Sequence, residues 1–176
     1  IKDEELASCE AINRQPIEFR VGTDALAVVV SKENDFATNI TMEELAALFS
    51  TATNWSDVNP EWPNEPILRY IPGTDSGTFD YFVEEVFDKD KEPILAANPE
   101  MSEDDNVLVQ GTLGSPYAVT FFGYAYYEEN ADNLNVLSVD GIIPDAESVN
   151  SAEYPLARPL FIYSTAEIMQ EKPQVA

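Results

Sequence analysis

The stretch "PGTDSGTFDYF", residues 72–82, places small and hydroxyl-bearing residues directly before an apolar pattern with helical spacing. The first N–H groups of a helix have no partner within the helix, and the helix dipole adds about half a positive charge there. Gly77 has no Cβ, so an oxyanion could approach the backbone closely. Ser76 and Thr78 add hydroxyl donors, Asp75 adds an acceptor, and Thr74 lies beside them. An anion site and an ordinary helix N-cap at Ser76 explain this stretch equally well.

The composition limits the partners that such a site could have. The 176 residues contain 33 acidic and 9 basic residues, a formal net charge of −24. Nucleic acid and anionic membrane surfaces both need a basic face, so we expect neither as a partner. No apolar run approaches the roughly 20 residues that span a bilayer, so we expect no membrane insertion. The acidity suits a salt-rich or extracytoplasmic setting, and any secretion signal is expected to be absent or already removed.

The missing residues limit the chemistry. The chain has no histidine, which excludes a Ser-His-Asp triad, a histidine-bearing zinc site and an imidazole base. Cys9 is the single cysteine, so no internal disulfide can form. Dinucleotide-binding, phosphate-loop and calcium-loop motifs are also absent. Catalysis by paired carboxylates stays open, because 33 acidic residues make some pair inevitable, but no spacing points to it. We expect a protein that is not an enzyme and that uses no cofactor or metal.

The pattern of apolar residues predicts strands that alternate with helices. Residues 25–30, "ALAVVV", form a continuous apolar run typical of a buried parallel strand, and residues 67–71 form a second strand. The segment "TMEELAALFS" predicts a helix in which Thr41 and Glu44 form a capping box. Ser102 is the expected N-cap of a later helix. This alternation predicts an α/β fold with a mostly parallel sheet and helices on both faces.

Several motifs, in order, resemble the phosphate-binding proteins that serve bacterial and archaeal phosphate ABC transporters. "PGTDSGTFDYF" is similar to the anion-binding helix start of that family. "GTDALAVVVSKEN", "NWSDV", "FFGYAYYEEN" and "YPLARPLFIY" resemble other family segments, so the likeness covers nearly the whole chain. It implies a periplasmic-binding-protein-like lobe that binds inorganic phosphate and delivers it to a membrane permease. It also implies a periplasmic or cell-surface location, with a lipid anchor possible in a longer protein.

The resemblance further implies site residues and a domain plan. Ser76, Gly77 and Thr78 would contact phosphate, with Asp75 and Thr74 supporting or contacting it. Residues 1–20 would be a remnant of a first lobe and the entry to the hinge, and residues 21–155 the second lobe. Residues 156–176 would be the returning hinge strand and the start of a first-lobe helix. The family's opening anion loop has no counterpart here. Many members carry an arginine four residues before the motif serine, where this chain has Pro72. Arg69 and Arg158 are alternatives, and neither matches the pattern.

Other functions stay open from the sequence. A binder of another oxyanion would use the same helix start. An extracellular adhesion or scaffolding protein could keep the fold and lose transport. An enzyme acting on phosphoryl groups would need a base, a nucleophile or a metal ligand set, and no motif supplies one.

Overall fold

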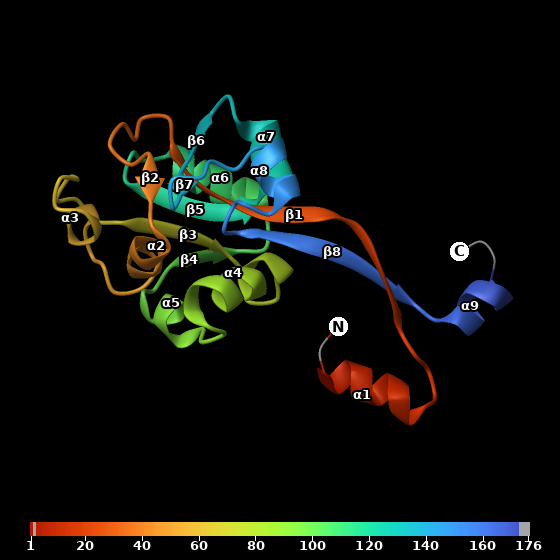
Figure 1. Ribbon diagram of the computed structural model, residues 1–176. Coiled ribbons are helices and arrows are strands. Elements are labelled where there is room, and N and C mark those ends of the chain that lie inside the picture. Colours follow the sequence, from red (N-terminus) through yellow and green to blue (C-terminus); the bar gives the residue numbers. More distant parts are fainter. Residues whose placement is uncertain (2, 173–176) are drawn as a thin grey trace. The chain divides into compact units, whose positions relative to one another are not determined.

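The computed structural model describes residues 1 and 3–172. The chain divides into two compact units. One comprises Ile1–Thr23 and Pro159–Ala176, and the other comprises Asp24–Arg158. The larger unit contains most of the central sheet and the candidate site (Figure 1).

The central sheet has the strand order β4-β3-β5-β1-β6, and β8 also pairs with β1. β3 is parallel to β4 and to β5, whereas β1 is antiparallel to β5 and to β6. Four strands therefore share one direction, and β1 runs against them. β2 and β7 form a separate parallel pair. The strands are β1 (Ile17–Ser31), β2 (Asn39–Ile40), β3 (Leu68–Pro72), β4 (Glu100–Ser102), β5 (Ala118–Gly123), β6 (Leu134–Val136), β7 (Ser138–Val139) and β8 (Ala157–Ser164).

The predicted α/β class, with a mostly parallel sheet, is confirmed, but the predicted direction of residues 25–30 is wrong. These residues lie in β1 and are fully buried, and both strands beside them there run antiparallel. A continuous apolar run indicates that both faces of a strand are buried, and burial does not depend on the direction of the strand. The sequence pattern therefore predicted the position of the strand and missed its orientation.

Helices cover both faces of the sheet, as predicted. The helices of the larger unit are α2 (Met42–Leu48), α3 (Trp55–Val58), α4 (Gly77–Phe87), α5 (Glu92–Ala96), α6 (Asp105–Leu113), α7 (Tyr124–Asn130) and α8 (Ala146–Ser151). The other unit contains α1 (Asp3–Ala11) and α9 (Ala166–Glu171). One core cluster joins buried side chains of α2 and α4 to Phe121 of β5. A second cluster lies on the other face of the sheet, where side chains of β1 and Phe122 of β5 pack against α6.

Local sequence signals explain how several of these helices begin. Thr41 caps α2, and its hydroxyl and the Glu44 carboxylate form the predicted capping box. The helix predicted from Ser102 begins later. Ser102 ends β4, and the Asp104 side chain caps α6 by accepting from the Asn106 N–H at 2.9 Å. The polar stretch before it contains α5 and β4.

Candidate functional site

The candidate site lies at the end of β3. In a parallel sheet, the connections from the strands to the helices that follow them lie at the carboxyl edge of the sheet. Open α/β sheets bind ligands at this edge. β3 ends at Pro72, residues 73–76 form the connection, and α4 begins at Gly77. β5 ends at Gly123, which pairs with Leu26 near the start of the buried part of β1. The loop predicted to bind an anion therefore lies at the carboxyl edge of the sheet (Figure 1).

Backbone hydrogen bonds fix the shape of this loop. The Gly73 N–H donates to the Ser102 carbonyl at the end of β4, at 3.0 Å. The Ser76 N–H donates to the Gly73 carbonyl at 3.0 Å and closes a turn over residues 73–76. The Asp80 N–H donates to the Ser76 carbonyl at 3.1 Å, which is the first regular bond of α4. The turn thus delivers the chain directly into the helix.

Ser76 is the N-cap of α4, as the ordinary interpretation of the motif predicts. Its backbone is extended (φ −82°, ψ 130°), and its Oγ accepts from the Thr78 N–H at 3.2 Å. The hydroxyl proton stays available for a further acceptor. Among the described residues, the Gly77 and Phe79 N–H groups make no hydrogen bond. One of the three first-turn amides is thus capped from within, and two are not.

The surroundings leave room at this helix start. Thr74, Asp75 and Gly77 are exposed, and Ser76 and Thr78 are half-buried. A Cβ built on Gly77 would meet no atom within 4 Å. A small oxyanion could therefore reach the Gly77 amide without displacing a side chain.

Glu103 is a neighbour that the sequence did not predict for this site. A Cβ built on Gly73 would lie 1.6 Å from Glu103 Oε1, so this carboxylate covers Gly73. With Ser102 as the expected N-cap, Glu103 would begin a helix, but α6 begins two residues later and leaves Glu103 in the β4–α6 connection. Asp75 and Glu103 thus put two carboxylate acceptors at or beside the loop. Such acceptors favour an oxyanion that still carries a proton over a fully ionised one.

The two arginines considered as ligands do not reach the helix start. Arg69 is buried beneath α2, where its Nε donates to the Leu48 carbonyl at 2.6 Å. Burial lowers the pKa of the Arg69 guanidinium from its ordinary value. Arg158 pairs with Asp24 at 3.1 Å, and its guanidinium lies 4.3 Å from the centre of the Tyr81 ring. Since Tyr81 belongs to α4, Arg158 contacts the helix one turn beyond its start.

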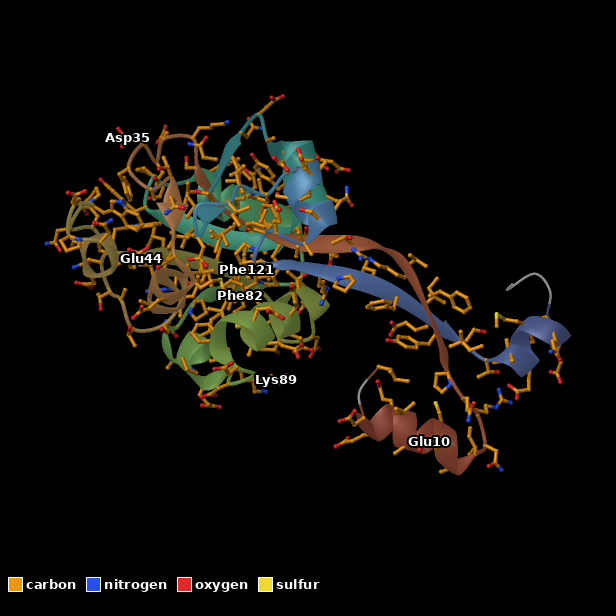
Figure 2. All side chains as sticks on the ribbon, viewed as in Figure 1. Glu10, Asp35, Glu44, Phe82, Lys89 and Phe121 are labelled. Carbon is orange, nitrogen blue, oxygen red and sulfur yellow. The ribbon has the colours of Figure 1, made fainter. Side chains whose placement is uncertain are left out.

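The packing beneath α4 holds the helix firmly. Phe82 of α4 stacks on Phe121 of β5, with ring centres 3.8 Å apart and an interplanar angle of 8°. Figure 2 shows these two rings between α4 and the sheet. Phe79 and Val83 are buried on the same face. Burial is also the main cause that raises the pKa of Tyr81. The donors of the loop are therefore carried on a helix that is fixed by a packed aromatic core.

Within residues 1 and 3–172, no group of three or more His, Cys, Asp or Glu side chains is arranged to hold a metal ion. No helix in the same residues is long and apolar enough to cross a bilayer.

The fold and the helix-start loop at its carboxyl edge define an α/β lobe of the periplasmic-binding-protein type. Residues 1–168 match the model of the PBP superfamily domain. The chain belongs to this superfamily of binding proteins.

Individual proteins similar to this chain give a narrower comparison than the superfamily does. It is 38% identical over 183 residues to Protein SphX from Synechocystis sp., which covers 98% of this chain and 54% of the relative. It is 34% identical over 177 residues to the phosphate-binding protein PstS of Staphylococcus saprophyticus, covering 97% of this chain and 54% of that protein. The chain thus spans about half the length of the curated relatives that it matches. The resemblance to phosphate-binding proteins stated from the motifs is confirmed.

Solved structures agree with the fold. A possible phosphate binding protein from Planctomyces limnophilus superposes with a TM-score of 0.81 at 37% identity, over 99% of this chain and 64% of that one. An ABC-type phosphate transport receptor from Vibrio cholerae gives the same TM-score at 18% identity, which supports the fold alone.

Proposed function

We propose that this chain is a ligand-binding part of a solute-binding protein for inorganic phosphate. Ser76, Gly77 and Thr78 supply hydrogen-bond donors to the phosphate oxygens, and Thr74 and Asp75 support or contact the ligand. The observation that carries the proposal is the start of α4, where Gly77 is exposed, its N–H has no partner among the described residues, and a Cβ built there would meet no atom within 4 Å. The names of relatives more than 30% identical point to the same ligand.

The acidity of the protein is compatible with this ligand. Charges are screened over roughly 8 Å at physiological salt, so distant surface acids weigh little against donors in contact. Each hydrogen bond to a charged oxygen contributes about 1.5–3 kcal/mol. Phosphate can carry a proton at neutral pH and sulfate does not, so Asp75 as an acceptor selects phosphate. Residues 21–155 act as one lobe in this proposal, and residues 1–20 and 156–176 lead to a second.

The proposed role is transport without catalysis. A binding protein of this kind would close around phosphate, release it to an ABC transporter permease and hydrolyse nothing. This role needs a periplasmic or cell-surface location. The PBP superfamily supports it in general terms, and the named transport receptor among the structural neighbours supports the fold that it requires.

The test is a phosphate titration followed by NMR of the backbone amides. We expect the amide resonances of Gly77, Thr78 and Phe79 to shift with phosphate. Ser76→Ala and Thr78→Ala should each weaken binding by about 1–3 kcal/mol, because each removes a donor to a charged oxygen. Gly77→Val should weaken it more, because its side chain would occupy the approach to the amide.

Matched controls separate a lost donor from a damaged fold. Ser151→Ala removes a surface hydroxyl of α8 and should leave phosphate binding unchanged. Asp75→Asn should reduce the preference for phosphate over sulfate without a loss of helix content. If phosphate moves no amide near residue 77, or if all three site variants bind as the parent does, the proposal is wrong.

A further inference from the structure

Arg69 of β3 is a buried cation with unused hydrogen-bond donors. It is 9% exposed. Its Nε donates to the Leu48 carbonyl, and one terminal nitrogen donates to the Ala52 carbonyl. Within residues 1 and 3–172 the ion pairs are Lys89–Glu84 and Arg158–Asp24, so no carboxylate pairs with Arg69. A buried charge without an opposite charge is unusual, most of all in a chain with a net charge of −24.

The carbonyl contacts account for one edge of the guanidinium. Leu48 is the last residue of α2, and the carboxyl end of a helix carries partial negative charge that favours a cation. A guanidinium has five N–H groups. The two bonds in the described residues use two of them and leave three, of which two, one on each terminal nitrogen, lie side by side at the outer end of the fork. This outer end can bind two oxygens of one carboxylate or phosphoryl group side by side.

A cavity of ≈ 380 Å³ adjoins Arg69. This volume lies within the usual range for pockets that bind small molecules. Three hydroxyl-bearing residues of the loop after α2 (Ser50, Thr51 and Thr53) border it. The remaining lining comes from Ala52, Pro66, Ile67, Ala96 and Ala97.

The acid beside this loop is turned to the backbone. Asp57 accepts from the Thr53 and Asn54 N–H groups at 2.9 and 2.8 Å, and these bonds lower the pKa of its carboxyl group. The Asp57 carboxylate therefore holds the backbone of this loop, and it forms no ion pair with Arg69.

We propose that the cavity beside Arg69 is a second anion site, which takes a small molecule bearing a carboxylate or a phosphoryl group. The outer donors of Arg69 bind two oxygens of that group, and the loop hydroxyls border the rest of the molecule. This site lies near the amino end of β3, whereas Ser76 follows the carboxyl end of the same strand. The proposal is independent of phosphate binding at Ser76.

The test uses succinate and inorganic phosphate as probes on the intact chain, followed by NMR of the Arg69 Nε–H and of the amides of residues 50–53 and 96–97. We expect at least one probe to shift these resonances in the Ser76→Ala background, where the helix-start site is weakened. A response to succinate indicates a carboxylate ligand, and a response to phosphate alone indicates a phosphoryl ligand. If neither probe moves these resonances at tens of millimolar, the proposal is overturned.

A matched pair of variants tests the site without touching the buried arginine. Ala96 is exposed and lines the cavity, so Ala96→Glu places a competing carboxylate there, and Ala96→Gln adds the same bulk without charge. We expect Ala96→Glu to bind the responding probe at least about tenfold more weakly than Ala96→Gln. Equal affinities in this pair would contradict the role of Arg69.

Arg69→Lys keeps the charge and removes the fork. We expect it to lose at least about tenfold in affinity for the same probe. An unchanged affinity in a folded Arg69→Lys variant would overturn the proposal. If this variant does not fold, the Ala96 pair decides the question.

Discussion

Asp145 shows at the residue scale how this acidic chain uses a carboxylate to begin a helix. Its Oδ1 accepts from the Glu147 and Ser148 N–H groups at 2.9 and 2.8 Å, and its own N–H donates to Ser148 Oγ at 3.0 Å. Ser76 caps α4 with a neutral hydroxyl instead and accepts from one amide only. A carboxylate cap supplies its own negative charge, so the hydroxyl cap is the one that leaves room for an added anion.

We expect Asp145 to make the stability of the protein depend on pH. The bond from the Ser148 N–H is the largest cause that lowers the pKa of the Asp145 carboxyl group below its ordinary value. The unfolded chain therefore takes up the proton first, near pH 3.9, and the stabilisation by the charged cap is lost as the pH falls further. Urea unfolding at pH 7 and pH 3 should show a smaller loss in Asp145→Asn than in the parent, since asparagine keeps an acceptor that does not titrate. Equal losses would exclude this role.

At the scale of elements, α4 and α6 follow neighbouring parallel strands but present different helix starts. α6 is capped by the Asp104 side chain, and Asp105 occupies its first helical position. Burial, together with the charge of Asp104, raises the pKa of Asp105. α4 begins with a hydroxyl cap and glycine, and its first acid is Asp80. Two similar strand–helix connections thus differ in charge, and only the one at α4 leaves its first residues without a carboxylate.

The contact between α6 and β3 depends on a glycine. A Cβ on Gly111 would lie 2.4 Å from the Tyr70 ring, too close for any real contact. Gly111→Ala should lower the free energy of unfolding by about 1–3 kcal/mol, because the cost of overpacking exceeds the gain of up to about 1 kcal/mol in helix propensity. Urea denaturation measures the change. In a Tyr70→Leu background the same substitution should cost much less, and an equal cost there would show that the ring is not the obstacle.

At the scale of the whole molecule, charge is the dominant feature. The chain has 33 acidic and 9 basic residues, so its negative charges repel one another in the compact folded state. We expect its thermal midpoint to rise when sodium chloride is increased from low to physiological strength, because physiological salt screens charges that are more than roughly 8 Å apart. The same titration near pH 4.1, the isoelectric point, should change the midpoint far less. A midpoint that does not depend on salt at neutral pH would contradict this expectation.

Prediction from the sequence succeeded where short-range chemistry decides. The Thr41–Glu44 capping box, the Ser76 cap and the buried strand around Val28 each follow from neighbouring residues, and the structure contains them all. It failed for the cap of α6, because Ser102 and Asp104 are both good caps and pairing of β4 with β3 claims Ser102 for a strand. The ligand roles of residues 74–78 remain predictions.

The sequence by itself determined the fold class, the exclusion of histidine chemistry and the small, donor-rich helix start after Pro72. These depend on residue type and on spacing within a few positions. The tertiary structure alone decided that β1 runs against its neighbours, that Glu103 covers Gly73 and that Arg69 lies buried beside a cavity. Each of these joins residues distant in the chain or depends on where an element begins, and the energy of such contacts comes from burial and pairing that no local pattern encodes.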